Sequence, residues 1–116
     1  KTKANHHDGL IAEVQAHLDR QYGDNQNLDA LAHAFNTSKR TLIRRFKQAL
    51  GLTPHAYVQQ IRIEVAQKLL AETQHSVEQV MNMVGYEDMS SFRRLFRQQA
   101  GVTPVEYRKR FAKRLF

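Results

Sequence analysis

One segment of twelve residues occurs twice in this chain, fifty positions apart. Residues 46–57 read FKQALGLTPHAY and residues 96–107 read FRQQAGVTPVEY, so that Phe, Gln, Gly, Thr, Pro and Tyr recur in place. Self-similarity at a fixed offset marks a supersecondary unit that is used more than once. Two copies are too few for a solenoid, which needs about three repeats to bury its faces. The repeat therefore predicts one domain built from two similar units.

Helical spacing is clear before the first copy of the repeat. Residues 1–8 are polar and are expected to form a tail. The following apolar residues recur every three or four positions, which predicts an amphipathic helix of about three turns. Its expected inner face consists of Leu10, Ile11, Val14, Leu18 and Tyr22.

The first unit is expected over about residues 27–50, as two helices joined by a turn. Asn27 and Ser38 (or Thr37) are good N-caps for these helices, and Asn36 lies where a tight turn favours a positive φ. Gly51 is expected to end the second helix in the left-handed conformation. The buried positions of the unit are Leu28, Leu31, Ala32, Phe35, Leu42, Phe46 and Leu50.

A long helix is expected to connect the two units. Thr53 is a good N-cap and Pro54 is favoured at the first helical position, so the helix should run from Pro54 to about Glu72. Its apolar stripe is Tyr57, Ile61, Val65 and Leu69, with Val58 and Leu70 beside it.

The second unit is expected over about residues 76–100, followed by a last helix over about 104–114. Ser76 and Gln79 form a capping box, as do Thr103 and Glu106 at the start of the last helix. Gly85 takes the place of Asn36, and Asp88 takes the place of Ser38. The predicted buried positions are Val77, Val80, Met81, Val84, Phe92, Phe96 and Ala100, with Tyr107 and Phe111 in the last helix. No segment has the alternation of a strand, so the fold class is all-α with about seven helices.

The chain carries a formal charge of +7, and its basic residues are concentrated in the repeat. Such an excess favours a polyanionic partner. Of 18 Lys and Arg residues, eight lie in the second helices of the two units, at positions 39, 40, 44, 45, 47, 93, 94 and 97. Five more lie within 108–114. A basic stripe at the same helical phase in both units indicates binding to nucleic acid rather than a solvated surface.

A short helix, a turn and a second helix with a basic outer face describe a helix-turn-helix unit. Residues near the start of such a helix read base edges in the major groove, and long basic residues beside them contact phosphates. The expected base contacts are Arg40, Thr41, Ile43, Arg44, Met89, Ser90, Ser91 and Arg94. The expected phosphate contacts are Lys39, Arg45, Lys47, Arg93, Arg97, Arg108 and Lys109.

Several runs of residues resemble the AraC/XylS family of bacterial transcription regulators. The resemblance covers about residues 10–111 and is strongest in the second half. It is carried by Leu28–Ala32, Ser38–Leu42, Arg45-Phe46, Gly51–Pro54, Ile61–Leu70, Gly85–Phe92, Gly101–Pro104 and Tyr107. The run YEDMSSFRRLF at 86–96 resembles the subgroup with an N-terminal, PfpI-type amidotransferase-like domain.

The resemblance implies a sequence-specific DNA-binding domain with two helix-turn-helix units and a linker helix. The linker would hold the two reading helices about 34 Å apart, in successive major grooves, with the DNA bent if the linker is rigid. The second unit has the shorter Ser90 at the position where the first unit has Arg40, so the two units are expected to read different half-sites. The partners implied are a double-stranded DNA operator, RNA polymerase and a missing N-terminal sensing or dimerising domain. The location implied is the bacterial cytoplasm, at the nucleoid.

Other functional classes find little support in the sequence. The chain has no Cys, its six His residues lack the spacing of a helical metal pair, and no nucleophile elbow or Gly-rich phosphate loop occurs. We therefore expect no cofactor, no metal and no enzymatic activity. No apolar run is long enough to span a membrane. The chain starts at Lys1 without Met, so we expect a fragment of a longer protein.

Two rival functions stay open. The first is a non-specific DNA- or RNA-binding basic domain, which would stack bases on exposed aromatic residues. The aromatic residues here fall at core positions instead. The second is a membrane-surface helix formed by segment 107–116, which is basic and amphipathic. For this segment we favour the alternative that it is a last helix of the domain, with Phe111 and Leu115 packed inward.

Overall fold

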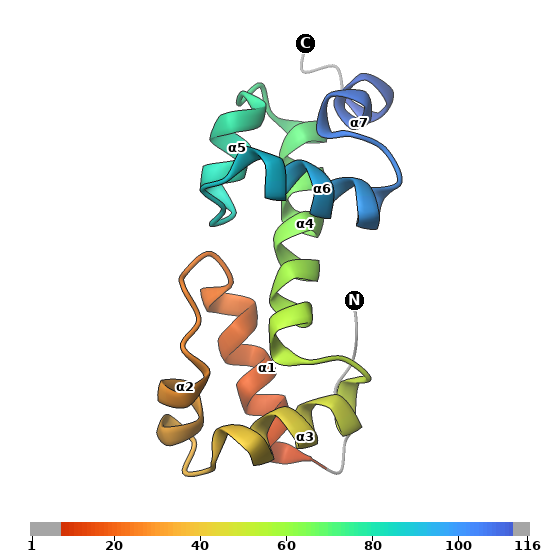
Figure 1. Ribbon diagram of the computed structural model, residues 1–116. Coiled ribbons are helices and arrows are strands. Elements are labelled where there is room, and N and C mark those ends of the chain that lie inside the picture. The colour runs from red at the N-terminus through yellow and green to blue at the C-terminus, as the bar shows by residue number, and fades with distance from the viewer. Residues whose placement is uncertain (1–7, 113–116) are drawn as a thin grey trace. The chain divides into compact units, whose positions relative to one another are not determined.

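The computed structural model describes residues 8–112, which form seven α-helices and contain no strand (Figure 1). The helices are α1 (Gly9–Gln21), α2 (Leu28–Ala34), α3 (Lys39–Leu50), α4 (Pro54–Glu72), α5 (Val77–Met83), α6 (Met89–Ala100) and α7 (Pro104–Phe111). The predicted fold class is confirmed. The expectations for residues 1–7 and 113–116, including an inward Leu115, lie outside the described residues.

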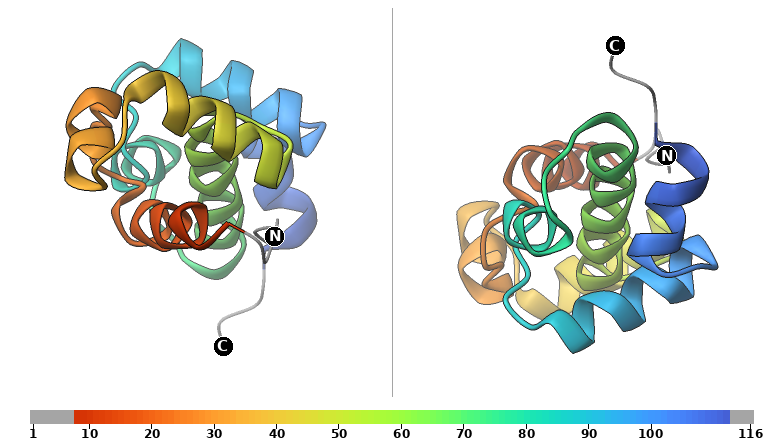
Figure 2. Two further views of the ribbon diagram at one scale, coloured as in Figure 1. Left: turned by 90° about the horizontal axis from the view of Figure 1, so that it is seen from below. Right: turned by 90° about the horizontal axis from the view of Figure 1, so that it is seen from above.

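The chain divides into two compact units, Lys1–Val58 and Gln59–Phe116. The boundary falls inside α4, so each unit contains part of this helix. The first unit consists of α1, α2, α3 and the start of α4. The second consists of the rest of α4, followed by α5, α6 and α7, and the right view of Figure 2 shows these three helices around α4. Each unit thus has the same series of four helical segments.

The repeat between the two units also includes the helical segment that begins each unit. Three α1 residues have counterparts fifty-two positions later in α4, and all six are at most 1% exposed. The pairs are Ile11 with Ile63, Val14 with Ala66, and Leu18 with Leu70. The later part of α4 therefore has the same place in the second unit that α1 has in the first.

The core of the first unit forms where α1, α2, α3 and the start of α4 meet. Each of its larger aliphatic or aromatic side chains stabilises the fold by about 1.5–3 kcal/mol when it leaves water. The Phe46 ring packs edge-on against the Tyr57 ring, with centroids 5.5 Å apart. The buried apolar residues are Ile11, Val14, Leu18, Leu31, Ala32, Leu42, Phe46, Leu50, Tyr57 and Val58.

The core of the second unit is organised around a series of aromatic rings. Neighbouring rings lie 4.6 to 5.9 Å apart between centroids, in the order Tyr86, Phe92, Phe96, Tyr107, Phe111. Offset and edge-on contacts of this kind add to the stabilisation from area burial. The buried apolar residues are Ile61, Ile63, Ala66, Leu70, Val80, Met81, Val84, Phe92 and Phe96.

The predicted helix ends are confirmed by their hydrogen bonds. The side chains of Asn27, Ser38, Ser76, Asp88 and Thr103 accept from backbone N–H groups in the first turn of the helix that each precedes. Ser76 with Gln79, and Thr103 with Glu106, form full capping boxes. These side chains satisfy backbone donors that have no partner within the helix.

The turns between the helices of each unit also follow the sequence. Asn36 has a φ of 56° and Gly85 a φ of 97°, so the equivalent residues both adopt the left-handed region. Gly51 ends α3 at a φ of 81°, as predicted, and Gly101 ends α6 in the same conformation at a φ of 84°. The left-handed conformation costs other L-residues about 1–2 kcal/mol, which favours Gly at these helix ends.

Three expectations for the helices are corrected. Asp8 is not part of a tail, because its carboxylate caps α1 by accepting from the Ile11 N–H at 3.1 Å. The last helix ends at Phe111 and not at about 114, since Ala112 is extended. The Phe111 side chain is 52% exposed rather than buried, because α7 has no further helix to pack its end among the described residues.

The apolar stripe predicted along α4 is also only partly correct. Tyr57 and Ile61 are buried, but Val65 and Leu69 are half-buried. Val58 and Leu70, expected beside the stripe, are buried, and so are Ile63 and Ala66. The helix supplies side chains to two separate cores, so a single stripe does not describe it.

Candidate nucleic-acid interface

The outer face of α3 is basic and is fixed by the burial of the opposite face. Leu42 and Phe46 are fully buried, which leaves the stripe of Arg40, Arg44 and Lys47 exposed. These positions are separated by four and three residues and therefore lie on one side of the helix. Ile43, the apolar residue among the expected base contacts of this helix, is half-buried.

The outer face of α6 repeats this arrangement. Phe92 and Phe96 are fully buried, and the exposed positions include Ser90, Arg93, Arg94 and Arg97. Met89 and Ser91, which were also predicted to reach bases, are half-buried at the start of the helix. The structure thus gives each unit a 12-residue helix with one apolar and one exposed, cationic face.

Two predicted base contacts already take part in helix capping. The Thr41 hydroxyl oxygen accepts from Ser38 Oγ at 3.0 Å, and Ser91 Oγ donates to Asp88 Oδ2 at 2.6 Å. The hydrogen bonds from Ser91 are the main reason that the pKa of Asp88 lies below its usual value. Either hydroxyl would have to share or exchange this bond in order to contact a base.

Arg45 and Arg108, both predicted to contact phosphates, have partners within the protein. Arg45 binds Asp8 through two hydrogen bonds. Arg108 donates from Nε to the Leu70 carbonyl oxygen at 3.1 Å and from Nη2 to the Thr73 carbonyl oxygen at 3.3 Å. A cation at these carbonyls also interacts favourably with the partial negative charge at the C-terminal end of α4. Both residues therefore have a structural explanation that the sequence did not suggest.

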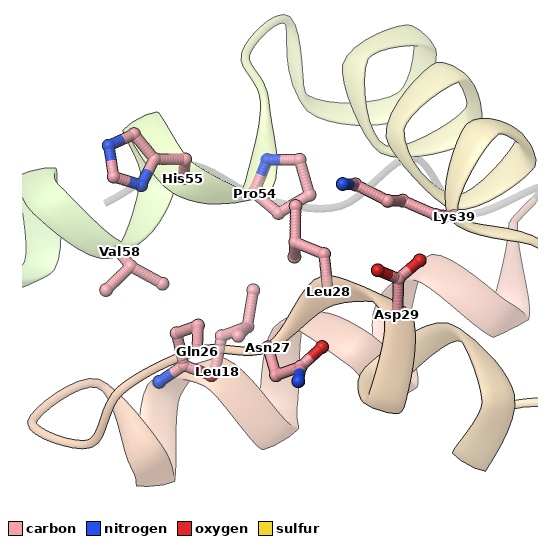
Figure 3. A pocket seen from close by; sticks show the side chains of 9 residues that line it. All are labelled: Leu18, Gln26, Asn27, Leu28, Asp29, Lys39, Pro54, His55 and Val58. Carbon is pink, nitrogen blue, oxygen red and sulfur yellow. The ribbon is translucent and has the colours of Figure 1, made fainter.

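Lys39 and Lys109 are the first and the last residues, in chain order, that were predicted to contact phosphates. Lys109 is exposed on α7. Lys39 lines a pocket of about 450 Å³ in the first unit, on the same wall as Asp29 (Figure 3). The pocket is surrounded by Leu18, Gln26, Asn27, Leu28, Asp29, Lys39, Pro54, His55 and Val58. An anion close to Lys39 would also feel the carboxylate of Asp29.

Two contacts that position the outer faces were not found from the sequence. The Tyr57 hydroxyl accepts from Gln15 Nε2 at 3.0 Å and donates to Asp19 Oδ1 at 2.6 Å, which joins α4 to α1 in the first unit. Arg62 contacts the turn between α5 and α6 in the second unit. Both follow from residues far apart in the chain. A polar Gln at a core phase of α1 was the available signal for the first contact.

Metal and membrane sites were also considered for residues 8–112. This part of the chain contains no group of three or more His, Asp or Glu side chains placed to hold a metal ion. His6 and His7 lie outside the described residues. None of the helices is both long and apolar enough to cross a membrane.

Comparisons with known proteins agree with this geometry. A family model described as "Helix-turn-helix domain" matches residues 31–110. The transcriptional regulator MtrA of Neisseria gonorrhoeae is 41% identical over 86 residues, which cover 74% of this chain and 29% of that protein. The transcriptional activator RhaS of Salmonella schwarzengrund is 32% identical over 106 residues, which cover 91% of this chain and 38% of that protein. The chain thus spans about a third of the length of these curated relatives.

Two solved structures illustrate the shared fold. The DNA-binding domain of the transcriptional factor AdpA, solved with a target DNA, has a TM-score of 0.82 and 30% identity, and the match covers 90% of this chain and 94% of that one. The C-terminal domain of AraT, a response regulator from Geobacillus stearothermophilus, has a TM-score of 0.88 at 24% identity, covering 94% and 91%. The second likeness concerns the fold alone.

Proposed function

Because this chain belongs to the AraC/XylS family of helix-turn-helix transcription regulators, we propose that it binds double-stranded DNA sequence-specifically through α3 and α6. Each of these helices would enter a major groove and read a short half-site. The observation that carries the proposal is the exposed basic face that recurs at the same phase of both helices, opposite fully buried Phe side chains.

The two helices are expected to read different sequences. Arg40 and Arg44 on α3 suit guanine, because a guanidinium can donate to O6 and N7 together. At the position equivalent to Arg40, α6 has Ser90, which is too short for that contact, while Arg94 corresponds to Arg44. We call the half-sites of α3 and α6 half-site 1 and half-site 2. In this proposal, Ile43 and Met89 contact thymine methyl groups, and Thr41 and Ser91 contact bases once their capping bonds are shared.

Phosphate contacts would set the register of the two helices on the DNA. The exposed residues Lys47, Arg93, Arg97 and Lys109 suit this function best, and Lys39 does so if Asp29 is screened by solvent. Arg45 and Arg108 fit less well because of their contacts within the protein. This ordering of the predicted contacts is supported by their exposure and by the hydrogen bonds described above.

The experiment that tests the proposal is selection of bound duplexes from random DNA at about 150 mM salt, where charge alone gives only weak binding. Two different motifs about 10 bp apart, the repeat of the DNA helix, are expected. Arg44→Ala and Arg94→Ala would assign the motifs to α3 and α6. The proposal would be contradicted if the protein retained all sequences equally and this binding disappeared at higher salt. That result would favour a domain that binds nucleic acid non-specifically through its charge.

One observation bears on the alternative function, non-specific binding of nucleic acid by exposed aromatic residues. Among the described Phe and Tyr residues, Phe111 alone is exposed. Its ring already stacks on Tyr107 at 4.6 Å. Non-specific binding of single strands uses several aromatic rings for successive bases, so one exposed ring does not favour it over duplex recognition.

The proposal gives this chain a binding function and no catalytic step. That the whole regulator also has a sensing or dimerising domain, of PfpI type or another, and that it contacts RNA polymerase at the nucleoid, stay predictions from the family resemblance. Affinity capture of RNA polymerase by the DNA-bound regulator would test the second of these.

A further inference from the structure

The turn between α5 and α6 is held by one side chain of α4. Arg62 Nη1 donates a hydrogen bond to the Gly85 carbonyl oxygen at 3.3 Å, and the Arg62 guanidinium carbon lies 4.9 Å from the centroid of the Tyr86 ring. A charge-assisted hydrogen bond and a cation–π contact thus act on two successive residues of the turn. This turn is one residue longer than the corresponding turn of the first unit.

A series of packed aromatic rings connects this turn to the inner face of α6. The Tyr86 ring packs against Phe92 at 5.8 Å, and Phe92 packs against Phe96 at 5.9 Å. Phe92 and Phe96 are fully buried, and the exposed arginines of α6 lie on the opposite side of the same helix. Close-packed interiors transmit small displacements. A shift of Tyr86 would therefore change the direction in which the outer face of α6 points.

A second contact with α4 holds the far end of α6. Gln99 Nε2, in the last turn of α6, donates to the Gln60 carbonyl oxygen at 3.1 Å. Arg62 acts before the first turn of α6 and Gln99 acts near its last turn. Both ends of the helix are thus connected to positions of α4 that lie two residues apart. The orientation of α6 relative to this part of α4 is consequently fixed at two points.

The first unit holds its helix in a different way. The residue that corresponds to Arg62, fifty-two positions earlier, is the apolar Leu10. There the middle of α3 is held by the two hydrogen bonds between Arg45 and Asp8. The position equivalent to Arg45 in α6 is Leu95, which cannot form such a pair. The two units therefore orient their outer helices with different residues, and a substitution can affect one unit alone.

We propose that Arg62 is the positioning residue of the second unit, which orients α6 through the turn and so determines sequence preference at half-site 2. Arg62 acts through Gly85 and Tyr86 and is not itself a base contact. The inference rests on the proposed function, since it assigns a recognition function to α6.

The test uses two DNA pools, one with half-site 1 fixed and half-site 2 randomised, and one with the reverse arrangement. Arg62→Met keeps the length of the side chain but removes its charge and donors. We expect this variant to lose about tenfold in preference for the selected half-site 2, the loss typical of one mismatched base pair. Its preference at half-site 1 should stay unchanged. Arg62→Lys, which keeps the charge and one donor direction, should retain most of the preference.

Two matched variants control for general effects. Tyr86→Phe keeps the ring under the guanidinium and its packing against Phe92, and should therefore keep most of the preference at half-site 2 and all of it at half-site 1. Asp8→Asn should show the reverse pattern from Arg62→Met, with the loss confined to half-site 1. Far-UV circular dichroism and urea unfolding of each variant separate a lost preference from a lost fold.

Equal losses at both half-sites, or no loss, in a folded Arg62→Met protein would overturn the inference. If Arg62→Met does not fold, Arg62→Lys decides in its place, with a smaller loss that must still be confined to half-site 2. A wild-type protein that selects no motif in either pool would contradict the proposed function itself, so the two failures are distinguishable.

Discussion

Asp8 and Arg45 are joined by two hydrogen bonds, from Nη2 to Oδ1 at 2.6 Å and from Nε to Oδ2 at 3.1 Å. The same carboxylate also accepts from the Ile11 N–H and caps α1. One side chain therefore fixes both the start of α1 and the middle of α3. The hydrogen bond from Arg45 is the main reason that the pKa of Asp8 lies below its usual value of 3.8.

This pKa predicts acid sensitivity of the first unit. Since the folded protein holds a proton on Asp8 less readily than the unfolded chain does, the stabilisation is complete above the usual value of 3.8 and is lost as pH falls through the lower, folded value. We expect urea unfolding, followed by circular dichroism, to show this loss between about pH 4 and the folded pKa.

Two substitutions separate the functions of Asp8. Asp8→Asn should remove the acid-dependent component and leave the cap, because Asn caps helices as well as Asp does. Asp8→Ala should cost about 1 kcal/mol more in the free energy of unfolding, from the lost cap. Identical stability of the two variants would mean that the carboxylate does not cap α1 in solution.

The Tyr57 hydroxyl is expected to stabilise the first unit through its bonds to Gln15 and Asp19. Tyr57→Phe should lower the free energy of unfolding by about 1–2 kcal/mol, because the substitution removes a buried hydrogen-bonded group and leaves the ring in place. Chemical denaturation measures this change.

The chain offers a matched control for Tyr57 in Tyr107, which occupies the equivalent place in the second unit. Among the described residues Tyr107 makes ring contacts with Phe96 and Phe111, and no hydrogen bond of its hydroxyl is seen there. Tyr107→Phe should change stability by less than about 0.5 kcal/mol. A Tyr107→Phe loss as large as that of Tyr57→Phe would show that the network around Tyr57 is not the cause.

Arg44 and Lys47 are expected to differ in the kind of DNA contact they make. Arg44→Ala should cost about 1–3 kcal/mol on the selected sequence and relax preference at particular base pairs. Lys47→Ala should weaken all duplexes alike and reduce the slope of log K against log salt by about 0.9, the value for one phosphate. Titrations at several salt concentrations measure both. The assignment of contacts is wrong if both variants lose equally on specific and random DNA.

Arg108 and Lys109 are neighbours with different expected functions. Arg108→Met should lower the free energy of unfolding by about 1–2 kcal/mol, because it removes charge-assisted bonds to two carbonyl groups at the end of α4. It should leave the salt slope of DNA binding unchanged. Lys109→Ala should do the opposite, with wild-type stability and a slope reduced by about 0.9. Urea unfolding and salt titration of both variants test this, and a reduced slope for Arg108→Met would restore its phosphate contact.

The helices and their ends could be predicted from the sequence because they depend on local chemistry. Asn27, Ser38 and Asp88 cap helices with their own side chains, and Gly51 ends α3 with its own backbone conformation. The exposed basic faces were equally accessible to sequence analysis. Helical phase alone places Arg44 opposite Phe46 and Arg94 opposite Phe96.

The contacts between distant segments could not be predicted in this way. The sequence shows that Arg45 and Arg108 are positively charged, but not which groups bind them. Asp8 lies 37 positions from Arg45, and Leu70 lies 38 positions from Arg108. A carboxylate in a polar tail or a carbonyl at a helix end gives no periodic signal. The burial of α4 was misjudged for a similar reason, since its phase is set by two cores and not by its own sequence pattern.

The unit boundary inside α4 has a consequence for how this protein can be divided. Domains that are connected by loops can be separated by a protease or by shortening the gene at the loop. Here a cut between Val58 and Gln59 would remove from the first unit the continuation of its last helix and from the second unit the beginning of its first. The two units thus adjoin within a single helix, and neither can be released from the chain without interrupting α4.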